Sequence, residues 1–367
     1  MASGVPPELS PFLIENVEGL NAEENRRGSG AYGAAYRVTV DGALCIAKRI
    51  HTLALNDQLS TPEKVTAQRN FAAECVTLSK LRHPNVVHFV GVHYQKGLSD
   101  LSLIMECLEM DLGRCLDTCP NIPLSVRLSI LQDVAYGLLY LHTHNPPIIH
   151  RDLSANNVLL TNQMTAKIAD LGVSKLLDIR KHASTKVPGT LYYMPPEALR
   201  PKPSYDSKLD IFSFGHLSLY VATQQFPEVH EVEMTASAFQ NKTIQILKRS
   251  EAFEKMGAEH LLHNVAYQCL QDSPEKRPTT TELLSMMHQL CVKHIQDRDE
   301  EISKLRQQLD AASKDLEEVS DHSKYQSQEL LKLKVELKYN VTVKDSFNTD
   351  LCHMSCSHVT LLSHINY

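Results

Sequence analysis

The sequence lacks the features that would assign the chain to a membrane, to a nucleic acid or to the secretory route. Its 367 residues carry a formal net charge of -6, so no basic excess is available to hold nucleic acid or an anionic membrane. No apolar run approaches the roughly 20 residues of a membrane span. The start MASGVPPELSPFL has neither the basic region nor the long apolar stretch of a leader peptide. These absences predict a cytoplasmic protein with no membrane span and no nucleic-acid partner.

A disulfide framework is also missing. The nine cysteines are an odd number, and they are scattered through apolar segments rather than regularly spaced. We therefore expect free and mostly buried thiols. Cys352 and Cys356 have His353 and His358 nearby, but no second ligand pair stands at zinc-binding spacing elsewhere, so an incidental cluster is favoured over a zinc site.

What is present is the composition and patterning of a globular protein. Hydrophobic residues make up 43% and charged residues 22%, and the length suits two domains or one two-lobed domain with an appendage. Residues 26–50 alternate as two or three short strands with a tight turn, and residues 63–82 have helical spacing. VVHFVGV and LSLIMECLE are short enough to be strands. A long helix is predicted over 125–142, and mostly helical chain follows to about residue 294.

The tail has a different pattern, in which apolar residues recur in alternating steps of three and four across a polar gap at Ser323 and Gln326. The residues of this heptad pattern are Ile302, Leu305, Leu309, Ala312, Leu316, Val319, Leu330, Leu333 and Leu337. Such spacing predicts a coiled coil over 295–340, which would pair in a homodimer or with another coiled-coil partner. The alternative is a single charged helix that folds back on the preceding domain. Residues 341–367 show no usable periodicity.

A glycine-rich segment, GSGAYG, offers the first sign of chemistry. Gly28, Gly30 and Gly33 would let backbone amides approach a polyphosphate without side chains in the way. Taken alone, the segment fits a flexible hairpin turn equally well.

The residues that follow strengthen the phosphate interpretation. Lys48 ends an apolar strand 15 residues after Gly33, and Glu74 lies in the helix predicted next; alone, each would be an ordinary surface charge. HRDLSANN then begins at His150, DLG at Asp170, and PPE ends at Glu197. In this order and spacing the chain resembles the eukaryotic protein kinases over about residues 20–292. HPN, DIFSFG and a late Arg-Pro pair also match, and the mixture of motifs resembles the tyrosine-kinase-like group.

The resemblance implies a bilobal α+β protein-kinase fold, with a small β-rich N-lobe and a large helical C-lobe, followed by the coiled-coil helix. The expected domains are a lead-in over 1–20, the kinase domain over 21–292, the coiled coil over 295–340 and an irregular tail over 341–367. ATP would be the phosphoryl donor, Mg²⁺ the cofactor and a protein the substrate.

The resemblance also implies the catalytic roles. Asp152 would accept or orient the proton of the substrate hydroxyl. Lys48 would hold the α- and β-phosphates, with Glu74 fixing its ammonium by an ion pair. Arg151 would bind a phosphate on the activation loop. In that loop the expected residues are Ser184 and Thr185 as phosphorylation sites, Thr190, and Glu197 braced by Arg277.

Nucleotide and metal contacts follow in the same way. Asn157 and Asp170 would ligate magnesium, which prefers hard oxygen ligands. The three glycines would cover the phosphates. Met105 would stand behind the adenine, and the backbone from Glu106 to Leu108 would bond its edge. The remaining side chains expected around the base are Ala35, Ile46 and Leu159.

Several residues depart from the kinase pattern. Leu171 replaces a phenylalanine, an apolar exchange that we expect to be harmless. Ala35 stands where valine is usual and Ile46 where alanine is usual, so volume lost on one strand is gained on its neighbour. Arg27 replaces an apolar residue without a physical explanation. Ser154 stands where serine/threonine kinases carry a lysine, so the local cation is absent.

Three functions remain open. An active kinase is favoured because all five groups that the chemistry needs, Lys48, Glu74, Asp152, Asn157 and Asp170, are present. The alternative is a pseudokinase scaffold that binds nucleotide and holds partners through the coiled coil. A small-molecule kinase is disfavoured by the PPE motif and its loop. For an active kinase we expect Ser and Thr hydroxyls as acceptors, with Tyr not excluded.

Overall fold

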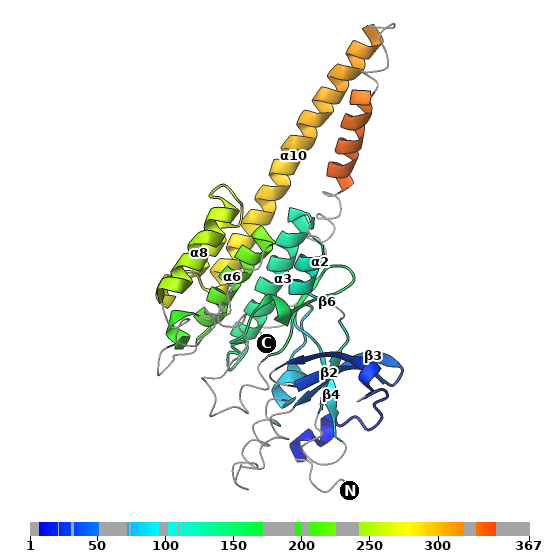
Figure 1. The fold of residues 1–367 in the computed structure, drawn as a ribbon, viewed down its shortest axis with the longest axis vertical. Coiled ribbons are helices and arrows are strands. Elements are labelled where there is room, and N and C mark those ends of the chain that lie inside the picture. The colour runs from blue at the N-terminus through cyan, green and yellow to red at the C-terminus, as the bar shows by residue number, and fades with distance from the viewer. Residues whose placement is uncertain are drawn as a thin grey trace. The chain divides into compact units, whose positions relative to one another are not determined.

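The structure is a computed structural model of the chain. It describes residues 7–20, 22–30, 33–50, 72, 75–94, 102–108, 110–119, 121–171, 195–199, 206–224, 242–318 and 328–342. The chain forms two compact units (Figure 1): residues 1–121 with 130–284, and residues 122–129 with 285–367.

The N-terminal lobe of the first unit is built on a five-stranded sheet in the order β1-β2-β3-β5-β4, and every neighbouring pair is antiparallel. Its strands are β1 (Arg26–Gly30), β2 (Gly33–Val40), β3 (Ala43–Ile50), β4 (Phe89–His93) and β5 (Ser102–Glu106). Asp41 and Gly42 join β2 to β3 with φ of 48° and 80°. Two successive residues at positive φ match the twist of a two-residue hairpin. The predicted strands and their turn are thus confirmed.

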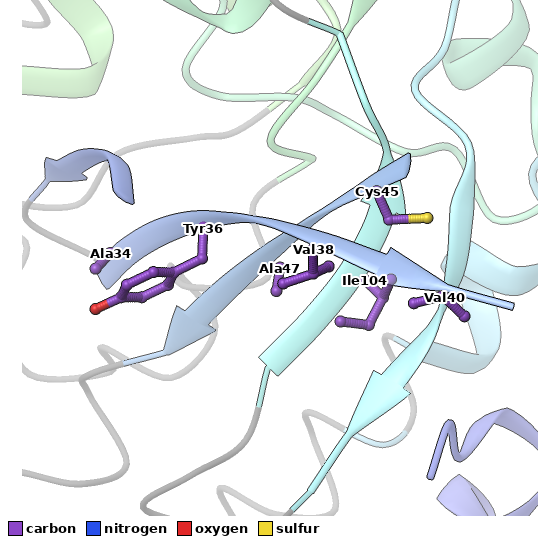
Figure 2. Packing of buried hydrophobic residues seen from close by; sticks show 7 residues of the cluster. All are labelled: Ala34, Tyr36, Val38, Val40, Cys45, Ala47 and Ile104. Carbon is purple, nitrogen blue, oxygen red and sulfur yellow. The ribbon is translucent and has the colours of Figure 1, made fainter. Parts of the chain in front are cut away.

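Alternation along β2 and β3 gives the sheet two distinct faces. One face carries a cluster of buried residues, whose side chains come from three strands (Figure 2): Ala34, Tyr36, Val38, Val40, Cys45, Ala47 and Ile104. The opposite face carries Ala35, Ile46 and Lys48, which are only partly buried. Around Ala35 and Ile46 this second face is available for a ligand, because these residues belong to neither buried cluster of the sheet.

Before the sheet, two short 3₁₀ segments lie at Pro7–Phe12 and Glu23–Asn25. After β3, residues 72 and 75–80 are helical, in agreement with the helix predicted over 63–82, most of which lies outside the described residues.

The C-terminal lobe is helical and is organised around α6 (Lys208–Thr223), in which every residue from Leu209 to Val221 is buried. A helix buried all round belongs to the centre of a domain. Around it lie α2 (Leu112–Thr118), α3 (Leu124–Thr143), α8 (Lys242–Met256) and α9 (His263–Cys269). A small sheet, β6 (Met110–Asp111), β7 (Val158–Leu160) and β8 (Ala166–Ile168), completes the lobe. The predicted helix over 125–142 corresponds to α3.

The tail differs from the single seam that the heptad pattern predicted. Helix α10 (Thr280–Glu318) begins inside the first unit and continues past residue 295 without a break. A second helix, over 328–342, runs beside it in the opposite direction (Figure 1). Arg298 of α10 donates a hydrogen bond to Asn340 of this helix. We call residues 285–318 and 328–342 the tail hairpin.

The tail hairpin covers part of the heptad seam within one chain. Ile302 and Leu305 are buried, and Leu330, Leu333 and Leu337 are half-buried. A helix of the same chain lies against this part of the seam, and the predicted pairing with a second chain stays a prediction.

The structure bears on the cysteines and on membrane-spanning helices only for the residues that it describes. Within the described residues, cysteines 45, 75, 107, 115, 119, 269 and 291 form no disulfide bond, and five of them are buried. Cys352 and Cys356 lie outside the described residues. Within the part of the chain that is described, no helix is long and apolar enough to cross a membrane.

Candidate active site

The candidate site begins with a buried aspartate that holds the HRD loop by its backbone. Asp210 lies in the first turn of α6 and is fully buried. Its Oδ2 accepts a hydrogen bond of 2.8 Å from the His150 amide, and its Oδ1 accepts one of 2.8 Å from the Arg151 amide. A carboxylate gripping two successive amides sets the position of the loop that carries Asp152.

His142 of α3 stabilises the buried negative charge of Asp210. His142 Nε2 lies 2.8 Å from Asp210 Oδ2, and His142 Nδ1 lies 2.6 Å from Thr280 Oγ1. Burial alone would raise the pKa of Asp210, but the hydrogen bond from His142, the electrostatic interaction with His142 and His150, and the hydrogen bond from the His150 amide outweigh it and lower the pKa. The carboxylate is therefore ionised at neutral pH and bonded on both oxygens.

The loop is also tied to the segment that carries the DLG motif. His150 Nε2 donates to the Ala169 carbonyl at 2.7 Å, and its Nδ1 accepts from the Asp152 amide at 3.2 Å. Arg151 and Asp170 have φ of 66° and 64°, a region that non-glycine residues seldom adopt and that is found at functional sites. Two of the residues that the motifs predicted, Arg151 and Asp170, thus have this seldom adopted backbone conformation.

Asn157 and Asp170 come from neighbouring backbones. The Ala169 amide donates to the Asn157 carbonyl at 2.8 Å, which places the two ligand candidates side by side in the chain's fold. Asn157 Nδ2 donates to the Asp152 carbonyl at 2.7 Å, so the amide oxygen is turned away from that contact and is available to a cation. One amide oxygen and one carboxylate are hard donors of the kind that Mg²⁺ takes together with phosphate oxygens and water.

Lys48 joins the sheet lobe to this group. Its ammonium donates to Asp170 Oδ1, and the two side chains are 18% and 31% exposed. The cation and the carboxylate that the motifs assigned to phosphate and metal therefore meet directly. Glu74, the expected partner of Lys48, lies outside the described residues.

The residues expected around the adenine lie on one face of the sheet. In the register of β2 and β3, Ala35 is opposite Lys48 and Arg37 is opposite Ile46, so Ala35 and Ile46 are diagonal neighbours on the same face as Lys48. Met105 of β5 is opposite Ile46. Ala35 and Ile46 can therefore contact the same bound base, with the small side chain beside the large one.

The remaining expected residues near the base are half-buried. Leu108 follows β5, and Leu159 lies on β7 opposite Lys167. Gly28 and Gly30 belong to β1, where Gly30 is opposite Gly33 of β2. Residues 31 and 32, at the tip of the glycine-rich segment, lie outside the described residues.

Sequence reasoning missed one ion pair near this region. Lys167 Nζ contacts both Glu106 carboxylate oxygens at 2.8 Å, and Glu106 Oε1 also accepts from the His88 amide at 2.7 Å. The sequence predicts only a backbone role for Glu106. No local pattern marks Lys167 as its partner, because the two residues are 61 positions apart.

A second ion pair agrees with its expected partners. Arg277 Nη1 lies 2.5 Å from Glu197 Oε1 and Nη2 lies 2.9 Å from Oε2, and both residues are buried. The guanidinium also lies over the Phe212 ring, 4.7 Å from its centroid. This fork-like pairing ties the PPE motif to α6. Ser184, Thr185 and Thr190 lie outside the described residues.

Comparison with known proteins identifies relatives for most of the chain. Residues 22–289 match the protein kinase domain family. A probable LRR receptor-like serine/threonine-protein kinase of Arabidopsis thaliana is 32% identical over 76% of this chain and 30% of its own length. The serine/threonine-protein kinase CTR1 of the same plant is 31% identical over 74% of this chain and 31% of its own length. The dual specificity protein kinase shkA of Dictyostelium discoideum is 27% identical over 78% and 51%. The chain thus spans about a third to a half of the length of these relatives.

Proposed function

Because the chain belongs to the protein kinase family, we propose that it transfers the γ-phosphoryl group of ATP to Ser and Thr hydroxyls of proteins. One observation carries the proposal: hydrogen bonds and ion pairs link Asp210, the loop of Asp152, Asn157, Asp170 and Lys48 into one connected group. Phosphoryl transfer depends chiefly on positioning and charge, and this group supplies both.

Each residue has a distinct task in the proposed reaction. Lys48 neutralises phosphate charge and draws the nucleotide toward Asp170. Asp152 receives or orients the hydroxyl proton as the acceptor oxygen attacks phosphorus and the bond to the ADP oxygen breaks. The left-handed backbone at Arg151 and the Asp210 grip on its amide hold Asp152 in place.

Magnesium would be held by Asn157 and Asp170. When bound, it would neutralise the charge of the phosphate oxygens. The protein's part is to keep the two oxygen donors together through the bond between the Ala169 amide and the Asn157 carbonyl. The buried His150 supports the same segment from the opposite side, through the Ala169 carbonyl.

The direct test is phosphate transfer from labelled ATP with magnesium to the chain itself and to a generic protein substrate. We expect Asp152→Asn to lower the rate at least about 100-fold, and Lys48→Met and Asp170→Asn to abolish transfer without loss of fold. Asp310→Asn makes the same chemical change at an exposed position of α10 and serves as the matched control. Equal rates for native protein and Asp152→Asn would refute the proposal.

The choice of Ser and Thr rests on the relatives named as serine/threonine kinases. Ser154, which stands at the position of the missing lysine, is buried, so the side chain at this position offers no cation to an acceptor. Phosphoamino-acid analysis of the autophosphorylated chain tests the choice, with Ser184 and Thr185 as the expected sites. Phosphotyrosine as the main product would contradict it.

A pseudokinase scaffold is the second candidate function. It is favoured only by the departures at Ala35, Ile46 and Ser154, since no required side chain is missing from the sequence. Calorimetry and the transfer assay together separate the two functions. A scaffold would bind an ATP analogue with magnesium yet transfer no phosphate, and Asp152→Asn would then behave like the native chain in both assays.

For the tail we propose pairing of two copies, through a different surface than the heptad seam. Leu331, Val335 and Tyr339 are 62%, 63% and 58% exposed and share one face of the 328–342 helix. Such a stripe of large apolar residues is what a second copy would cover. In light scattering, we expect Val335→Asn to yield monomers and Lys334→Asn, at the preceding and exposed position of the helix, to remain paired. A monomeric native chain would overturn this.

A further inference from the structure

The N-terminal residues 7–20, which the sequence marked only as a lead-in, are attached to the sheet lobe at two points. We call them the strap. Leu13 forms a parallel bridge with Val92, and the Ile14 amide donates to the Val92 carbonyl at 2.9 Å. Glu18 bridges Thr39 in antiparallel fashion, with two hydrogen bonds of 3.0 Å. The strap therefore joins the edge strand β4 to the far end of β2.

The first half of the strap enters a core that it shares with the segment around Glu74. Leu9 is 1% exposed. The other buried members of its cluster are Ala72, Cys75, Phe89, Val92 and Leu103. Phe12 packs against the same cluster, and its ring meets that of Phe89 edge to face with centroids 6.1 Å apart. Ala72 and Cys75 lie on either side of Glu74 in the sequence. The strap therefore packs against residues close to Glu74 in the chain.

The second half of the strap covers the other side of the sheet from Lys48. Ile14, Val17 and Leu20 pack on the cluster that includes Cys45 and Ala47 of β3. Successive residues of a strand point to opposite faces, so Lys48, which follows Ala47, faces away from this half of the strap and shares a face with Leu103, its partner in the register of β3 and β5. One continuous segment thus contacts neighbours of both groups that the kinase resemblance pairs, Lys48 and Glu74.

The strap lies against β4 at a distance that only glycine permits. A Cβ built on Gly91 would stand 2.7 Å from the Phe12 carbonyl oxygen and 2.6 Å from Ile14 Cδ1. His93 Nδ1 also bonds the Ile14 carbonyl at 2.8 Å. A methyl group at position 91 would force the strap backbone outward, and this gives a way to loosen the strap without changing any of its own residues.

We propose that the strap, through Leu9 and Phe12, positions the helical residues 75–80, which follow Glu74 in the sequence, for phosphoryl transfer. The inference rests on the proposed kinase activity. These are positioning residues: they contact no reacting group, but they hold the buried side of Ala72 and Cys75 against β4 and β5. Losing that contact lets the segment shift, and misplacement of a catalytic group by about 1 Å lowers the rate of the reaction strongly.

The test compares four variants of the full chain. Leu9→Ala removes the buried contact, Gly91→Ala pushes the strap outward, and Val17→Ala truncates the strap only on the cluster of β2 and β3. For the first two we expect faster amide hydrogen exchange over residues 75–80 and kcat lower by about tenfold, with KM for ATP nearly unchanged. Val17→Ala should leave both close to native, and Leu9→Met should restore what Leu9→Ala loses.

Three results would overturn the proposal. The first is unchanged amide exchange over residues 75–80 in both Leu9→Ala and Gly91→Ala. The second is faster exchange in these variants without a fall in kcat. The third is a fall of kcat in Val17→Ala as large as theirs, with kcat in all variants following the melting temperature. If the native chain transfers no phosphate, the proposed function fails by itself. The exchange comparison then still decides whether the strap holds this segment.

Discussion

At the scale of single residues, Asp210 shows how one buried side chain organises a site. It contacts no predicted ligand, yet it fixes the amides of His150 and Arg151 and is balanced by His142. The DIFSFG motif matches the protein kinases, but the motif alone does not predict that Asp210 accepts hydrogen bonds from a loop 60 residues away. Its role depends on a contact between distant parts of the chain.

The adenine pair, Ala35 and Ile46, leads to a prediction about compensation. Since the two are diagonal neighbours on one face, Ala35→Val alone should crowd the base and weaken ATP binding by about tenfold. Adding Ile46→Ala should restore the native affinity. Titration calorimetry with an ATP analogue measures the cycle. Additive losses in the double variant would show that the two positions do not share one space.

His216 leads to a prediction about pH. Burial, with a smaller contribution from the charge of Arg249, lowers the pKa of this α6 histidine well below 6.5. Below pH 6.5, His216 therefore becomes protonated in the unfolded chain but stays neutral in the folded chain. The free energy of unfolding then falls as the pH drops. One such group adds a slope of up to about 1.4 kcal/mol per pH unit.

Urea unfolding at pH 7.5, 6.5 and 5.5 measures that slope. We expect His216→Leu to flatten it. His88→Gln should change it less, since His88 is half-buried and its pKa is also lowered, chiefly by burial. An unchanged slope in His216→Leu would mean that other groups cause the acid sensitivity.

At the scale of elements, the Glu197–Arg277 pair connects the PPE motif to the helical lobe. Arg277→Ala would leave a buried carboxylate without its bidentate partner, and we expect a loss of about 3–5 kcal/mol in the free energy of unfolding. Arg26→Ala is the matched control, because its ion pair with Glu23 is exposed and should contribute less than about 1 kcal/mol. Similar losses in the two variants, measured by urea unfolding, would contradict the assigned role.

Helix α10 shows that a heptad pattern indicates an apolar seam without identifying the helix that covers it. The steps of three and four did indicate an apolar seam, and Ile302 and Leu305 are buried. Periodicity says only that a helix has a face to cover. It does not say whether the cover comes from another chain or, as in the tail hairpin, from residues 328–342 of the same chain.

At the scale of the whole molecule, the tail predicts how autophosphorylation depends on concentration. Truncation after residue 294 removes the stripe of Leu331, Val335 and Tyr339 but keeps the buried Leu283, Met287 and Cys291 of α10. The truncated chain should be monomeric and phosphorylate added substrate at the native rate. Its rate of autophosphorylation should rise with protein concentration, whereas the rate of the paired native chain should be nearly independent of concentration.

Initial rates over a range of protein concentrations, with light scattering on the same samples, decide this prediction. Val335→Asn in the full chain is the control, because it should show the kinetics of the truncated chain while keeping the tail. If the truncated and native chains autophosphorylate equally fast at every concentration, the tail does not bring two active sites together.

The sequence by itself determined the features that depend on residues close together in the chain. The turn at Asp41 and Gly42, the alternation of β2 and β3, and α3 follow from local backbone preferences and periodicity. The ordered motifs were likewise sufficient to indicate the protein kinase family, which the match over residues 22–289 shows.

Only the tertiary structure decided which distant side chains meet. It paired Lys167 with Glu106, placed His142 against Asp210, laid the strap over two clusters of the sheet lobe and turned the tail back on itself. The physical reason is that these contacts are selected by burial and by the need to satisfy buried charges. Both depend on the packing of the whole chain, and neither leaves a repeat, a spacing or a motif in the local sequence.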